Sequence, residues 1–236
     1  MNFEDRVSAV AKLGFTERQA RFLTTVMLHA GVCVPRQYAR FAGIAYGHKV
    51  NRFFDKLVEH RYAVVSACRH NRAELYHIRH HALHAAISQP DSRYRRPVSA
   101  QLAIERLMLL DGVLTSPELM WLGDEAEKVA FFELMAPSLP RERLPHMTTG
   151  AGDTASIRLF PEQLPIGVST TGRTVFVYLV ATPPRETAGH VEPLQNGRSF
   201  GVPSRSTRYP ERLVVGRSRH EAARDGLRPL EAAGAK

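Results

Sequence analysis

A helical run in the first quarter of the chain carries side chains suited to nucleic-acid recognition. His48, Lys49, Asn51, Arg52 and Lys56 fall opposite the apolar residues of the same helical repeat. An asparagine amide can pair with the edge of adenine through two hydrogen bonds, and arginine or lysine can read guanine or bind phosphate. We therefore expect Asn51 to read adenine, Lys49 or Arg52 to read guanine or hold phosphate, and His48 to lie near the bases.

Two further groups complete the expected DNA-binding set. One lies at the start of a shorter preceding helix and comprises Arg36 and Gln37. The other lies at the tip of a following hairpin, where phosphate contacts are expected from Arg69, His70, Asn71 and Arg72.

Four histidines, His77, His80, His81 and His84, recur at spacings that would place several on one face of a helix. Histidines four residues apart can bind zinc, but a zinc site needs a third strong ligand, and no acid lies between them as in HExxH. We expect a basic helix beside DNA, with no metal and no other cofactor. Both the zinc site and the basic helix would make ligand affinity depend on pH.

The elements that must position these side chains can be predicted in order. Thr16 and Gln19 form a capping box that begins a helix ending before Gly31. Pro35 and Gly43 bracket a short second helix, because proline suits a first helical turn and glycine suits a C-terminal cap. The apolar face of a third helix comprises Val50, Phe53, Phe54, Leu57 and Val58.

A change of period after Tyr62 predicts a hairpin, with strands over residues 63–69 and 74–78. Helix, short helix, tight turn, longer helix and hairpin is the order of a winged helix-turn-helix, whose third helix enters the major groove of DNA. We assign residues 1–90 to such a domain.

The net charge of +9 is distributed unevenly along the chain. Residues 1–96 hold 16 Lys and Arg against 7 Asp and Glu, whereas residues 97–182 hold 6 against 10. A basic segment beside an acidic one suggests that the first binds a polyanion.

The sequence after residue 90 predicts a basic hinge, a small mixed α/β domain and a tail. The predicted fold of the whole protein is therefore of the α+β class. The hinge, residues 91–97, contains three arginines, and the second domain spans residues 98–182. Its first helix, residues 98–114, is apolar enough to pack in a domain core or to form a homodimer interface. The Arg-rich tail, residues 183–236, loses all periodicity, so we expect disorder except for a short helix near residues 218–225. Either the tail is a nonspecific nucleic-acid arm, or the second domain is truncated and the tail is non-native.

The segment from Gly14 to Val65, followed by LYHI, resembles the N-terminal winged-helix segment of the replication-relaxation family and related proteins of bacterial mobile elements. The likeness rests on the T-x-R-Q opening at Thr16 and the F-x-x-L-V-x-x-R pattern that begins at Phe54. The resemblance covers about a third of the chain. It implies a DNA-binding protein of bacterial mobile elements or transcription regulation, and a nuclease-type scaffold in the second domain.

Phosphodiester cleavage by such a scaffold requires clustered carboxylates that hold magnesium. Asp153 is one candidate, but the following apolar strand, residues 174–180, contains neither an acid nor a lysine. Walker and GxGxxG motifs are also absent from the sequence. We therefore expect no enzymatic activity.

Composition and targeting signals favour a cytoplasmic, nucleoid-associated protein. No apolar run is long enough to span a membrane, and the first residues lack the pattern of a secretory signal. Cys33 and Cys68 are far apart and are expected to be buried thiols.

The most favoured function is sequence-specific binding of double-stranded DNA as a transcriptional regulator or mobile-element accessory protein. Two alternatives stay open: a nuclease-like or relaxase-associated factor, and a winged helix that binds only proteins.

Overall fold

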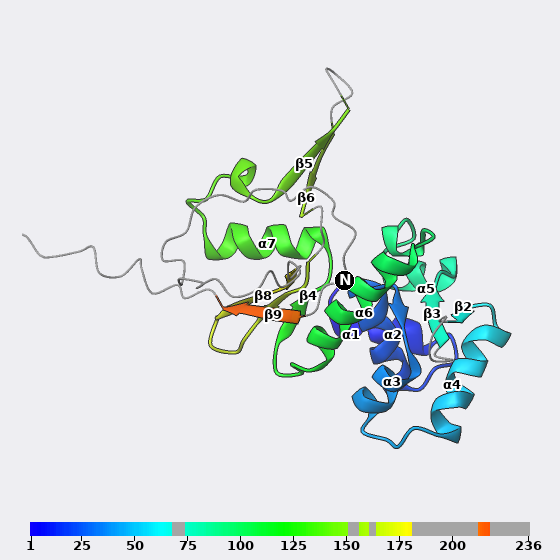
Figure 1. The fold of residues 1–236 in the computed structure, drawn as a ribbon. Helices are drawn as coiled ribbons and strands as arrows, with labels where there is room; N and C mark the ends of the chain where they lie inside the picture. Colours follow the sequence, from blue (N-terminus) through cyan, green and yellow to red (C-terminus); the bar gives the residue numbers. More distant parts are fainter. Residues whose placement is uncertain (68–73, 151–155, 161–163, 181–211, 218–236) are drawn as a thin grey trace, which may run out of the picture.

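The computed structural model describes residues 1–67, 74–150, 156–160, 164–180 and 212–217. The first part of the chain is built from helices with one small sheet (Figure 1). Its elements are α1 (Phe3–Ala11), α2 (Glu17–His29), β1 (Val32–Cys33), α3 (Pro35–Ala42), α4 (His48–Glu59), β2 (Ala63–Ala67), β3 (Glu74–Ile78) and α5 (His81–Ala86).

Local signals place the ends of these helices. The capping box of α2 is confirmed, because the Thr16 hydroxyl accepts from the Gln19 backbone and the Gln19 side chain accepts from the Thr16 backbone. Pro35 begins α3, and Gly43 ends it with a left-handed φ of 63°. The helix α1 was not predicted from the sequence; its N-cap side chain, Asn2, accepts from the Asp5 backbone at 2.8 Å.

Thr16→Ala is expected to lower the free energy of unfolding by about 1 kcal/mol, because the first turn of α2 loses the side-chain half of its capping box. Urea unfolding of the full chain measures the change. Ser8→Ala, on the exposed side of α1, serves as the control and should stay within about 0.5 kcal/mol of the parent. Equal effects of the two substitutions would contradict the capping role.

The small sheet is antiparallel and has the order β1-β3-β2. Val32 lies opposite His77 at one edge, and Val65 lies opposite Tyr76 in the hairpin. The strands β2 and β3 confirm most of the expected hairpin, while its tip lies outside the described residues.

A first core unites these elements around buried aromatic side chains. Phe53 contacts Phe22 and Tyr38 with ring centroids 6.3 Å and 4.3 Å apart. Ala103 and Leu110 join the same core from α6 (Ala100–Leu114). The apolar side of this helix, which we expected to serve the second domain or a homodimer, therefore covers the first core, and dimerisation through residues 98–114 stays an untested prediction.

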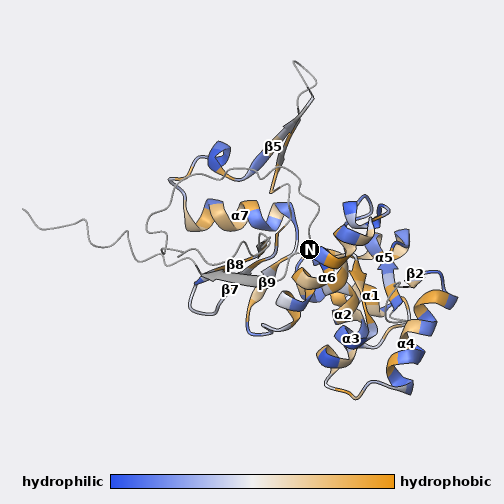
Figure 2. Cartoon of the chain, in the orientation of Figure 1, coloured by the Kyte–Doolittle hydropathy of each residue, from blue (hydrophilic) through white to orange (hydrophobic). Residues whose placement is uncertain are grey.

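The remaining elements form a second mixed α/β part, which agrees with the α+β class. They are β4 (Met120–Leu122), α7 (Glu125–Met135), η2 (Arg141–Arg143), β5 (His146–Thr149), β6 (Ser156–Leu159), β7 (Ile166–Val168), β8 (Thr174–Val180) and β9 (Arg212–Arg217), whereas η1 (Arg93–Arg95) packs on β3 of the first part. Four strands pair in the order β4-β7-β8-β9, and β5 pairs with β6. Figure 2 shows the mixed hydropathy of α7, whose Phe132 ring stacks on Phe176 of β8 at 6.5 Å.

The strand β9 corrects the expectation of a disordered tail for residues 212–217. It pairs antiparallel with β8, with Val177 opposite Val215. The physical reason is a short apolar run, LVV, which has strand propensity and extends an existing sheet edge. The helix expected near residues 218–225 lies outside the described residues.

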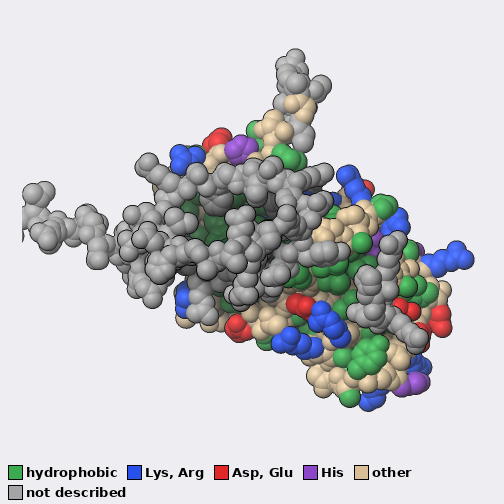
Figure 3. Space-filling model, in the orientation of Figure 1, with side chains coloured by type: hydrophobic (Ala, Val, Ile, Leu, Met, Phe, Trp, Pro, Cys, Tyr) green, Lys and Arg blue, Asp and Glu red, His purple; other side chains and the backbone are tan. Residues whose placement is uncertain are grey.

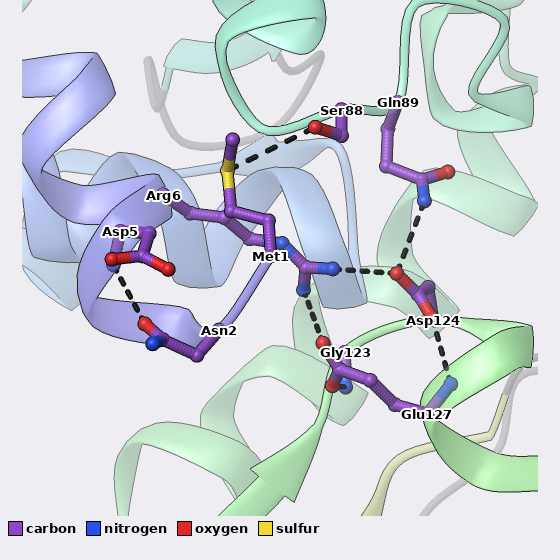
Figure 4. Close-up of polar contacts among 9 residues, drawn as sticks. All are labelled: Met1, Asn2, Asp5, Arg6, Ser88, Gln89, Gly123, Asp124 and Glu127. Carbon is purple, nitrogen blue, oxygen red and sulfur yellow. Dashed lines mark hydrogen bonds and ion pairs between the residues drawn. The ribbon is translucent and has the colours of Figure 1, made fainter. Parts of the chain in front are cut away.

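A buried ion-pair cluster joins the two parts of the chain (Figure 4). The Arg6 guanidinium of α1, only 2% exposed, contacts Asp124 at 2.5 Å and Glu127 at 2.8 Å. Both acids lie at the start of α7, and the Gln89 amide donates to Asp124 at 3.2 Å.

Across the described ranges, no helix is both long and apolar enough to cross a membrane.

Candidate nucleic-acid interface

The helix α4 presents the polar face that the sequence predicts. Val50, Phe53, Phe54 and Leu57 are at most 1% exposed and anchor the helix in the first core. A turn from the left-handed Gly43 leads into α4 and fixes its direction after α3. The exposed side chains at the start of α4 are His48, Lys49, Asn51 and Arg52.

Lys56 is only half-buried and is held at one edge of this face. Its ammonium group donates to the carbonyl oxygen of Gly14, in the loop before α2, and lies 4.8 Å from the centre of the Phe15 ring. The lysine therefore keeps its charge at a fixed place between α4 and the start of α2.

The structure removes Gln37 from the expected DNA-binding set. This side chain is 1% exposed, and its amide donates to the Leu107 carbonyl at 3.0 Å and to Asp111 at 2.9 Å. Its oxygen accepts from the Val34 backbone at 3.0 Å. The correction has a plain physical reason: the helix α6 covers this side of α3, so the amide is used inside the protein.

Arg36 is exposed but has an acidic partner. Its guanidinium contacts Asp111 of α6 at 2.9 Å, which balances most of its charge. The four residues expected at the hairpin tip, Arg69, His70, Asn71 and Arg72, lie outside the described residues.

The four clustered histidines do not share a helix. His77 lies on β3 and contacts the Tyr94 carbonyl at 2.6 Å, while His84 on α5 contacts the Ile78 carbonyl at 3.1 Å. His80 caps α5, and His81 is exposed. Within the part of the chain that the structure describes, no three His, Cys, Asp or Glu side chains gather as a metal site. The sequence-based expectation of a single histidine-bearing helix is therefore wrong.

An open groove of about 1020 Å³ runs between the start of α2, the end of α3 and one flank of α4. Basic side chains from two of these helices line it, namely Arg18, Arg21, Lys49, Arg52 and Lys56. Figure 3 shows basic side chains along the lower edge of the molecule, where Figure 1 places α3 and α4.

Arg18 is a groove residue that the sequence analysis missed. It lies in the first turn of α2, and its guanidinium donates to the Ala42 carbonyl at the end of α3 at 3.1 Å. A basic residue two positions after an N-cap is the only sequence signal, and this signal does not show that α4 lies opposite.

The comparisons with known proteins add no relative. No family model, curated protein or solved structure matches this chain. The resemblance to the replication-relaxation family stays a prediction.

Proposed function

We propose that residues 1–90 form a winged helix-turn-helix and that the protein binds double-stranded DNA through α4. The observation that carries the proposal is the exposed polar face of α4, presented after a short turn from α3 and anchored by four buried apolar residues. The order α2, β1, α3, α4, β2, β3 and the antiparallel sheet order β1-β3-β2 support it.

The chemistry of the exposed face suits base recognition. Asn51 can read adenine with its amide, and His48 lies in the first turn of α4, where base contacts concentrate. Residues 69–72, which lie outside the described residues, would contact the DNA backbone in this proposal. In this role the protein acts as a transcriptional regulator or a mobile-element accessory protein.

Selection of binding sites from a pool of random duplexes by the full chain tests the proposal. We expect an enriched sequence, bound with an affinity that falls as salt rises. Asn51→Ala should weaken binding to that sequence by about 1 to 3 kcal/mol, or roughly 5- to 150-fold, and relax the base preference at one position.

His48→Ala has a matched control in His81→Ala, because both side chains are exposed but His81 lies on α5, away from α4. The first substitution should weaken binding to the selected duplex, and the second should leave binding unchanged. A chain that binds no duplex, or that binds independently of salt, would exclude the proposed function.

A further inference from the structure

The basic residues of α4 are confined to one flank of the helix. Lys49, Arg52 and Lys56 are spaced three and four residues apart, so they form a stripe along one side. All three line the groove that α4 shares with the start of α2. Asn51 does not line it, which separates the amide from the basic stripe.

Four cations in the groove lack an acidic partner within 4 Å among the described residues: Arg18, Lys49, Arg52 and Lys56. Arg18 and Lys56 donate to backbone carbonyls, and these neutral acceptors leave the positive charges uncompensated. Arg21 differs, because it pairs with Glu4 at 2.7 Å and with Glu17, which also lines the groove, at 3.3 Å. The groove thus holds concentrated positive charge that an anionic ligand would neutralise.

The acids of α4 lie outside the groove. Asp55 and Glu59 are exposed but do not line it. Glu74 on β3 accepts a hydrogen bond from the Tyr76 hydroxyl at 2.6 Å. Burial raises the pKa of Tyr76 first, and this hydrogen bond and the negative charges of Glu74 and Asp55 raise it further. The charged residues of α4 that line the groove are therefore all cations.

The floor of the groove offers little aromatic surface for base stacking. Tyr38 and Phe53 line it, but they are 5% and 1% exposed because they pack in the first core, and Phe41 is the one lining aromatic residue that is partly exposed. Contacts to a ligand must therefore come mainly from the charged rim. A rim of cations above a closed apolar floor suits a chain of phosphates better than inserted bases.

We propose that this groove holds one sugar–phosphate strand of the bound duplex. The inference rests on the proposed function and deepens it, because it assigns Lys49 and Arg52 to phosphates instead of guanine. Arg18 and Lys56 contact the same strand from the two walls of the groove. Reading of bases then falls to Asn51 and His48.

Salt-dependent binding of the full chain to duplex DNA tests the groove. The double variant Lys49→Gln, Arg52→Gln is suitable because both side chains are exposed and neither has a described acidic partner. The slope of log affinity against log salt concentration should become shallower by about 2, since each lost phosphate contact contributes about 0.9. Affinity should fall on selected and unrelated duplexes alike.

The matched control is Lys12→Gln, Arg61→Gln, which removes the same two charges from exposed positions outside the groove. Its slope should stay close to that of the parent. If both variants shift the slope equally, or if the groove variant weakens only the selected sequence, the groove assignment is wrong while DNA binding stands. If the parent chain binds no duplex, the proposed function itself fails.

Competition with polyglutamate separates a phosphate strand from an acidic protein partner. Polyglutamate should compete weakly with the duplex when the two carry equal charge. Equal competition, lost in the groove variant, would assign the groove to an acidic peptide and overturn the proposal.

Discussion

Arg6→Met is expected to lower the free energy of unfolding by about 3 kcal/mol, because it leaves two carboxylates without their buried cation. Removing one partner of a buried ion pair typically has an effect of about 3 to 5 kcal/mol. The lower end applies here, since Asp124 is 16% exposed and Glu127 is 32% exposed, so water partly solvates the acids that remain.

A triple variant tests whether the loss comes from uncompensated charge. Arg6→Met combined with Asp124→Asn and Glu127→Gln should regain most of the stability. Asparagine can still cap α7 through the bond that Asp124 makes to the Glu127 backbone at 2.9 Å. Glutamine can still accept from the Gly123 backbone, which now contacts Glu127 at 2.7 Å.

Urea unfolding followed by Trp121 fluorescence measures the stability of both variants. This single tryptophan lies on β4, close in sequence to Asp124 and Glu127 of the ion-pair cluster. Arg21→Met is the control, since Arg21 pairs only with exposed acids and should change stability by at most about 1 kcal/mol. Equal losses of stability for Arg6→Met and Arg21→Met would contradict the role of Arg6 in the buried ion-pair cluster.

The features that the sequence predicts well are those with local causes. Thr16 and Gln19 lie three residues apart and begin α2, and Gly43 ends α3 because glycine tolerates a left-handed backbone. The apolar repeat of α4 likewise predicts which side is buried, except at Val58, which is 39% exposed. Each of these signals is contained within one turn or one helix.

The features that the sequence could not predict depend on distant partners. Gln37 looked like a polar surface residue, but its amide bonds to Asp111, 74 positions away. Arg6 lies in a short helix with no strong pattern, and its partner Asp124 is 118 positions away. Such pairings follow from the packing of α6 and α7 on the first part of the chain.

The groove illustrates the same limit for the candidate site. The sequence identifies Lys49 and Arg52 as exposed cations, but it leaves open whether they read bases or bind phosphate. Their shared flank with Lys56 can be read from helical spacing, whereas the opposing wall with Arg18 requires the arrangement of α2, α3 and α4. Function at this surface therefore depends on tertiary packing as much as on residue type.

Lowering the pH from 7.5 to 5 is expected to reduce the free energy of unfolding by roughly 4 kcal/mol through two buried histidines. Burial lowers the pKa of His29 to about 3, assisted by the charges of Lys128 and Arg6. Burial also lowers the pKa of His84 to about 4, although its contact with the Ile78 carbonyl acts in the opposite direction.

The direction of the pH effect follows from proton binding in the two states. Below pH 6.5 the unfolded chain binds protons on both histidines, while the folded chain does not until the pH approaches 4 for His84 and 3 for His29. Stability is therefore complete above pH 6.5 and decreases as the pH falls through this window. Lys128, whose burial lowers its pKa to about 8, stays mostly protonated between pH 5 and 7.5.

Urea unfolding of the parent and of His29→Leu at pH 7.5 and pH 5 separates this cause from general acid sensitivity. Leucine has a similar size and cannot bind a proton, so His29→Leu should lose about half of the pH dependence, whereas exposed His81→Ala should retain all of it. The hydrogen bond with Arg21 lowers the pKa of Glu4, so this carboxylate keeps its charge between pH 5 and 7.5. Two results would show that the buried histidines do not control acid unfolding. One is equal stability of the parent at the two pH values, and the other is an unchanged pH dependence of stability in His29→Leu.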